Sequence, residues 1–266
     1  MSTASADVWA SGDAYEPYVG RWSRLVAREF LTWLAVAQGA RWLDVGCGTG
    51  ALTDGILSTA APAHVQAVDS SLAYVLFARS RVRDRRAAFM VADARSLPQP
   101  AQSVDGAVSG LALNFIPHPD VALVEMARVV RAGGIVGAYV WDYAGQMQLM
   151  RYFWDAAVAL DPRASELDEA RRFPICHPAA LEALFRDARL QKVESSAIDV
   201  PTRFRDFDDY WRPFLGGQGP APGYVMGLGE EHRTALRERI RAALPTAADG
   251  SIDLVARAWA VRGTRA

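Results

Sequence analysis

The chain has 266 residues and 51% of them are apolar, which is enough for one large domain with a substantial core. Its 29 basic and 30 acidic residues leave a net charge of −1, so charge indicates neither nucleic acid nor an anionic membrane as a partner. The N-terminus lacks a basic start followed by an apolar core, and no segment is apolar for the ~18 residues of a membrane span, which predicts a cytoplasmic protein.

The first half of the chain alternates apolar runs with helical patterns from Ala40 to about Trp141. This alternation is typical of repeated βαβ units around a parallel sheet. Strands are predicted near 41–45, 64–68, 88–92, 104–109 and 134–141. The helices predicted between them span 51–60, 71–83 and 121–130.

The second half has a looser pattern, in which helices and two further strands follow one another. Helices are predicted at 147–160, 177–190, 207–215 and 230–244, with a glycine-proline connector at 216–229. Strand patterns resume at 190–200 and 251–263. Because these strands resume the sheet, a single domain is predicted over 1–266. Its parts are an N-terminal cover helix in 1–39, a ligand-binding core in 40–142, and inserted helices in 143–189 and 204–245 over the substrate.

The segment LDVGCGTG, residues 43–50, joins the first predicted strand to the first predicted helix of this core. Its three glycines, Gly46, Gly48 and Gly50, therefore fall on the turn, where the backbone must reverse tightly and a ligand can lie almost against it. Asp44 adds a carboxylate beside that surface. Glycine turns also occur in α/β proteins that bind nothing there, so the loop alone is weak support for a ligand site.

Each of the first three predicted strands has an acidic residue at its end: Asp44, Asp69 and Asp93. Residues at the carboxyl ends of parallel strands converge on one crevice, where doubly wound sheets bind their ligands. Asp69 stands 19 positions after Gly50, close to the ~20 expected for an acid that accepts hydrogen bonds from a ribose. Asp69 could also simply cap the helix that follows. The three acids together predict a nucleoside ligand.

Five segments in order carry a resemblance to a known family. They are LDVGCGTG, VDSS at 68–71, ADARSLP at 92–98, SVDGAVSGLALNFIPHP at 103–119 and ARVVRAGGIVGAYVWD at 127–142. With them, residues 40–141 resemble the class I S-adenosylmethionine-dependent methyltransferases, in particular the small-molecule branch that includes quinone-biosynthesis C-methyltransferases. The resemblance implies a Rossmann-like, doubly wound α/β fold with a seven-stranded, mostly parallel sheet and a lid of inserted helices. It also implies methyl transfer from S-adenosylmethionine to a small molecule.

The same resemblance implies which residues bind the cofactor. Asp44 and the glycine loop would face its methionine part, and Asp69 would hold both ribose hydroxyls. Asp93 and the amide of Ala94 would read the adenine edge. The implied set is Asp44, Gly46, Cys47, Gly48, Gly50, Asp69, Ser70, Asp93, Ala94, Ser109, Gly110 and Asn114. An N-terminal helix often covers the cofactor in such enzymes, and there Arg21 could pair with the methionine carboxylate; a solvated arginine is the alternative.

Aromatic residues near the predicted rim of the site are the candidates for binding the methyl acceptor: Tyr18, Trp22, Trp141, Tyr143 and Trp211. Aromatic side chains at such a rim suit a flat or apolar acceptor. At helical spacing, however, such residues are also typical of plain core.

No catalytic residue is assigned, because methyl transfer by in-line displacement depends mainly on alignment in a dry site. His118 and His177 stand beside prolines, which is typical of loop and helix-entry residues. The two cysteines, Cys47 and Cys176, and the scattered histidines have no metal-ligand spacing, so neither a metal site nor a disulfide is predicted.

Two alternatives to a methyltransferase stay open at this point. Gly46, Gly48 and Ala51 also fit the pattern G-x-G-x-x-A of nicotinamide-dependent oxidoreductases, although Asp44 would repel a pyrophosphate there. A non-catalytic protein that binds S-adenosylmethionine as a sensed ligand would carry the same motifs. The acceptor, the atom methylated and the oligomeric state are not predicted.

Overall fold

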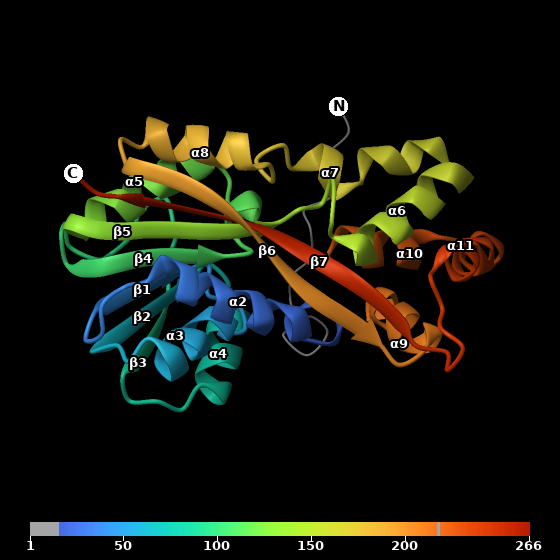
Figure 1. The fold of residues 1–266 in the computed structure, drawn as a ribbon, viewed down its shortest axis with the longest axis horizontal. Helices are drawn as coiled ribbons and strands as arrows, with labels where there is room; N and C mark the ends of the chain where they lie inside the picture. Colours follow the sequence, from blue (N-terminus) through green and yellow to red (C-terminus); the bar gives the residue numbers. More distant parts are fainter. Residues whose placement is uncertain (1–15, 217–218) are drawn as a thin grey trace.

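Seven strands form one sheet in the computed structural model, which describes residues 16–216 and 219–266 (Figure 1). The strands lie in the order β3-β2-β1-β4-β5-β7-β6. β7 is antiparallel to both of its neighbours, β5 and β6, and the other neighbouring pairs are parallel. Their bounds are β1 (Arg41–Val45), β2 (His64–Asp69), β3 (Ala87–Val91), β4 (Val104–Gly110), β5 (Val130–Trp141), β6 (Gln191–Phe204) and β7 (Ile252–Thr264). The predicted doubly wound, mostly parallel sheet of seven strands is confirmed.

Helices cover both faces of this sheet, as its central apolar strands require. Figure 1 shows α2 (Arg21–Leu34), α3 (Ala51–Thr59) and α4 (Leu72–Arg81) on one face, and α5 (Pro119–Val129) and α8 (Pro178–Asp187) on the other. In α2, the apolar residues recur at helical spacing and Val26, Phe30 and Leu34 are fully buried. The predicted helices of the core therefore exist, with ends that differ by a few residues.

The remaining helices lie near the end of the antiparallel β6–β7 pair at which β6 ends and β7 begins, with α7 nearer the middle of the pair (Figure 1). They are α6 (Gln148–Leu160), α7 (Glu169–Arg172), α9 (Phe207–Trp211), α10 (Pro220–Gly227) and α11 (Glu230–Ala243). The described residues also form four short non-α helices: the π-helix η1 (Glu16–Gly20) and the 3₁₀ helices η2 (Leu113–Phe115), η3 (Pro162–Glu166) and η4 (Arg212–Gly216). Phe153 of α6 stacks on Phe214 with ring centroids 4.6 Å apart, so these helices have an aromatic core of their own.

Two predicted boundaries were wrong. The connector predicted at 216–229 contains helix α10. Residues 217 and 218 of this connector lie outside the described part of the chain. Pro220 and Pro222 are tolerated because the first helical turn has no partner for its N–H groups, and burial of Val225 favours the helix. Strand β5 begins at Val130, directly after α5 and earlier than predicted, and its pairing with β4 shifts register before Ile135.

Glu169 is a buried acid that lies outside the sheet. It opens α7, is 2% exposed, and accepts a hydrogen bond from the indole N–H of Trp154 on α6. Burial raises the pKa of its carboxyl to about 8, and the charge of Asp168 acts in the same direction. Asp168 itself pairs with Arg151 at 2.7 Å. The folded protein therefore holds the Glu169 proton at neutral pH.

We predict that Glu169 makes the fold less stable as pH rises. An unfolded glutamate titrates at about pH 4.3, whereas the folded pKa is about 8. This contribution to the free energy of unfolding is therefore present below pH ~4.3 and is lost as pH rises to the folded pKa, at about 1.4 kcal/mol per pH unit at most. Glu169→Gln carries no charge, keeps an acceptor for Trp154 and should remove this slope.

Urea unfolding at several pH values between about 5 and 8 measures the slope. Glu166→Gln is the matched control, because Glu166 is an exposed acid on the preceding turn. An identical pH dependence for the wild type and Glu169→Gln would contradict the prediction.

Candidate active site

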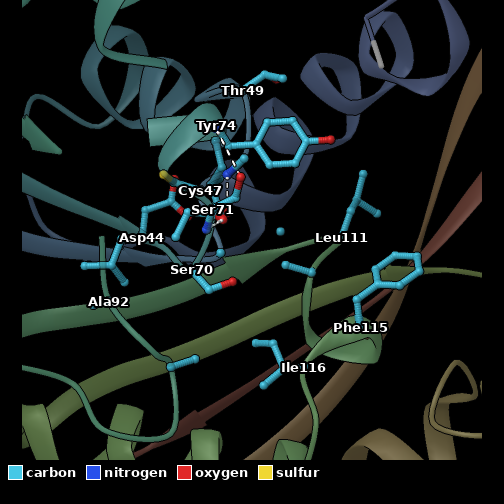
Figure 2. A pocket seen from close by; sticks show the side chains of 18 of the residues that line it. Asp44, Cys47, Thr49, Ser70, Ser71, Tyr74, Ala92, Leu111, Phe115 and Ile116 are labelled. Carbon is cyan, nitrogen blue, oxygen red and sulfur yellow. Dashed lines mark hydrogen bonds between the residues drawn. The ribbon is translucent and has the colours of Figure 1, made fainter. Parts of the chain in front are cut away.

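A cavity of about 490 Å³ opens at the carboxyl ends of β1, β2 and β4 (Figure 2). This is the crevice in which a doubly wound sheet brings strand-end residues together. Nine of the residues predicted to bind a cofactor line it: Asp44, Gly46, Cys47, Gly48, Asp69, Ser70, Asp93, Ala94 and Gly110. The three acids that were singled out in the sequence thus share one wall of one cavity.

The glycine loop that leaves β1 has left-handed backbone at three positions. Gly46, Gly48 and Gly50 have φ of +74°, +50° and +86°. At Gly46 a Cβ would lie 2.5 Å from the Cβ of Ala112, so this position also requires a close approach to the loop after β4. At Gly48 a Cβ would meet open space. Gly50 packs against α4 and does not line the cavity, so its role is structural.

Asp44 is fully buried at the end of β1. Its Oδ2 accepts a hydrogen bond of 2.6 Å from the Thr53 hydroxyl, while its Oδ1 has no partner among the described residues. Burial raises the pKa of this carboxyl to about 7, the Thr53 hydrogen bond lowers it and the charge of Asp69 raises it. An unpartnered buried carboxylate oxygen on a cavity wall is suited to a cationic or hydrogen-donating ligand.

Asp69 connects two loops at the cavity. Its Oδ2 accepts from the Gly48 amide and its Oδ1 from the Ser71 amide, both at 2.9 Å. Burial raises the pKa of its carboxyl, and these two bonds oppose the shift. Because a carboxylate has about four acceptor positions, Asp69 keeps capacity for ligand hydroxyls after binding both amides.

Asp93 differs from the other two acids because it is exposed and paired. Its carboxylate binds the Arg95 guanidinium, with a shortest distance of 2.7 Å. The Arg95 side chain and backbone amide lower the pKa of Asp93 to about 2. It therefore stays an anion in the folded protein at neutral pH.

The outer wall of the cavity is mostly apolar. Figure 2 shows Leu111, Phe115 and Ile116, from the segment after β4, on the side of the cavity away from Asp44. Tyr139 of β5 pairs opposite Gly110, where a Cβ would lie 2.5 Å from the Tyr139 hydroxyl oxygen. Gly110 is therefore needed so that the tyrosine can reach the cavity.

Several predicted site residues do not line the cavity. Arg21 pairs with Asp209 at 3.1 Å and stacks over the ring of Trp22, which stabilises it away from the cavity. The Ser109 side chain faces the opposite side of β4 from its neighbour Gly110, as strand alternation requires. Asn114 is buried in η2 behind the wall.

The predicted acceptor-binding aromatics pack into the protein core instead. They are Tyr18, Trp22, Trp141, Tyr143 and Trp211, each less than a tenth exposed. For example, Tyr18 donates to Met150 Sδ and packs edge-on against Phe214. In the described part of the chain, no residue after Tyr139 lines the cavity. The helices of 143–189 and 204–245 are therefore not part of its wall. His118 and His177 precede α5 and α8 as N-cap residues and also do not line it.

Sequence reasoning missed several lining residues: Ser23, Ser71, Tyr74, Tyr139 and Ile116. Ser71 and Tyr74 lie two and five residues after Asp69, so the strand-end argument could have included them. Tyr139 required knowledge of the register between β4 and β5, because the sequence pattern favoured the later aromatics Trp141 and Tyr143.

Comparison with known proteins agrees with this geometry. Residues 43–138 match the family described as a methyltransferase domain. The chain is 31% identical over 242 residues to a malonyl-[acyl-carrier protein] O-methyltransferase of Halorhodospira halophila, which covers 84% of this chain and 75% of that protein. The chain belongs to the class I S-adenosylmethionine-dependent methyltransferases. This assignment does not support the nicotinamide alternative.

Other methyltransferases match over shorter stretches or only in fold. A 2-methyl-6-phytyl-1,4-hydroquinone methyltransferase of Oryza sativa is 30% identical over 153 residues, which are 58% of this chain and 41% of that protein. The chain spans half or less of the length of several curated relatives that it matches. A phosphoethanolamine-type N-methyltransferase of Haemonchus contortus, solved with S-adenosylhomocysteine, shares the fold with TM-score 0.59 and 16% identity, over 96% of this chain and 57% of that one.

We predict that two glycines of this methyltransferase's loop differ sharply in their tolerance of alanine. Gly48→Ala adds only the strain of left-handed backbone, about 1–2 kcal/mol. Gly46→Ala adds the same strain and a clash with Ala112, so its free energy of unfolding should fall by a further ~1–3 kcal/mol. Urea unfolding of both variants measures the difference, and equal losses would contradict the close approach.

Proposed function

We propose that this methyltransferase transfers a methyl group from S-adenosylmethionine to a small molecule with an apolar surface. The unpartnered Oδ1 of the buried Asp44, on the same cavity wall as Asp69, is the observation that carries the proposal. The three acids lie at the carboxyl ends of three neighbouring strands: Asp44 near the end of β1, Asp69 at the end of β2 and Asp93 just after β3.

Each acid suits one part of this cofactor. The free Oδ1 of Asp44 would accept from the methionine ammonium group. Asp69 would accept from the ribose hydroxyls while still holding Gly48 and Ser71. Asp93 and the Ala94 amide would bind the adenine edge at the exposed end. Arg21 is not included, since Asp209 already pairs with it.

The reaction asks mainly for alignment and for the exclusion of water. The bound donor supplies an electrophilic methyl group on a positively charged sulfur. The wall formed by Leu111, Phe115 and Ile116 would hold an apolar acceptor against it and keep water out. Gly110 leaves room for Tyr139 beside this wall, because any side chain there would meet the tyrosine. A cytoplasmic location and the exclusion of nucleic acid as a partner stay predictions.

Calorimetric titration tests the proposal directly. S-adenosylmethionine and S-adenosylhomocysteine are each titrated into the protein, with NADH and NADPH as controls. Binding of the first pair alone is expected. Binding of the nicotinamides alone would overturn the proposal.

Turnover separates the methyltransferase from a protein that only senses the cofactor. The purified protein is incubated with S-adenosylmethionine and a panel of carboxylic acids, quinols and amines, and S-adenosylhomocysteine is measured. Its acceptor-dependent formation is expected. Tight cofactor binding without turnover on any compound would favour the non-catalytic alternative.

We predict that Asp69→Ala weakens cofactor binding by ~1–3 kcal/mol, the range for losing a hydrogen bond to a charged group. The variant also frees the amides of Gly48 and Ser71, so the loop loosens as well. Asp69→Asn keeps one acceptor oxygen and should lose less. Asp54→Asn, an exposed acid on α3, is the matched control. Unchanged binding by folded Asp69→Ala would refute the role.

A further inference from the structure

Thr53 is a buried hydroxyl residue in the first turn of α3. A threonine inside a helix commonly donates to the carbonyl four residues earlier. Thr32 and Thr59 do this here, at 3.0 and 2.7 Å. The Thr53 hydroxyl donates instead to Asp44 Oδ2, at 2.6 Å. Its hydroxyl is thus directed across to Asp44 of β1, a residue that lines the cavity.

This hydrogen bond makes the two carboxylate oxygens of Asp44 different from each other. Oδ2 is held by Thr53, and Oδ1 is the oxygen without a partner. A side chain that is bound on one oxygen presents the other in a fixed orientation. Asp44 is fully buried and belongs to the lining of the cavity, so this fixed oxygen lies close to the space that a ligand would occupy.

The bond also acts on the charge of Asp44. Burial favours the neutral acid, and the negative charge of Asp69 acts in the same direction. Cys47 is the other titratable group that interacts with these two acids, and it is not cationic either. Against them, the Thr53 hydroxyl and backbone amide lower the pKa of Asp44. Without the hydroxyl, a larger fraction of Asp44 would be protonated at neutral pH.

We propose that Thr53 is a positioning residue that holds Asp44 as a carboxylate with one free oxygen, ready for the ammonium group of an amino-acid-bearing nucleoside. The inference rests on the proposed function, because it specifies how the Asp44 end of that site recognises its ligand. It assigns Thr53 no contact with the ligand.

The test compares two ligands that differ in the amino-acid part. S-adenosylhomocysteine carries the ammonium group, whereas 5′-methylthioadenosine keeps the adenosine and thioether and lacks the amino acid. Thr53→Val removes the hydroxyl with little change in shape. At about pH 7 it should weaken S-adenosylhomocysteine binding about tenfold, since the lost bond is to a charged group, and leave 5′-methylthioadenosine binding within about twofold.

Two further variants serve as controls. Thr53→Ser keeps a hydroxyl and should restore the preference for S-adenosylhomocysteine. Thr59→Val removes a hydroxyl of the same helix that bonds only to Gly55, and should change neither affinity. An equal loss for both ligands in Thr53→Val, or no loss for either, would overturn the inference.

The wild type provides a readout that does not depend on a folded variant. Its preference for S-adenosylhomocysteine over 5′-methylthioadenosine should fall as pH is lowered from about 8 to about 5.5, because Asp44 becomes neutral. A constant preference over this range would also overturn the inference. If the wild type binds both ligands, the cofactor proposal stands whatever the outcome for Thr53; if it binds neither, the cofactor proposal itself fails.

Discussion

The cavity depends on the bridge that Asp69 makes between two loops. Its carboxylate binds the amide of Gly48, in the loop after β1, and that of Ser71, in the loop after β2. The amides of Gly46 and Cys47 both donate to the carbonyl of Val68, the residue before Asp69. The glycine loop is thereby fixed to the end of β2 by backbone groups and a single acid. Loss of the Asp69 carboxylate would leave the amides of Gly48 and Ser71 without this acceptor and would weaken the link between the two loops.

The fold of the core could be predicted from sequence because local and long-range signals agree there. A strand buried on both faces reads as an apolar run, as in Trp42–Val45 of β1, and the next helix begins where the glycines end. The predictions failed where a tertiary contact overrode local preference. Pro220 and Gly223 predict a connector, yet the segment forms α10 because Val225 is buried against neighbouring helices. Nothing in the local sequence reveals that contact.

The acids at the strand ends were more predictable than the apolar wall of the cavity for the same physical reason. Asp44, Asp69 and Asp93 are placed by the ends of parallel strands, which a sequence pattern locates within a residue or two. The apolar wall depends on which aromatic side chains reach the cavity, and that is set by register and packing. Trp141 lies only two residues beyond Tyr139, but Trp141 is core and Tyr139 lines the cavity.

Two acids in this protein, Asp44 and Glu169, are buried at a cost in desolvation, but their surroundings differ. Burial raises the pKa of both Asp44 and Glu169, and each gives up stability if it ionises. Glu169 meets Trp154 in a packed region, so its proton can simply stay in place. Asp44 faces a cavity with one oxygen unused and a threonine that favours its anion. A buried acid with an unpartnered oxygen, in the lining of a cavity, is suited to a ligand that supplies the missing donor.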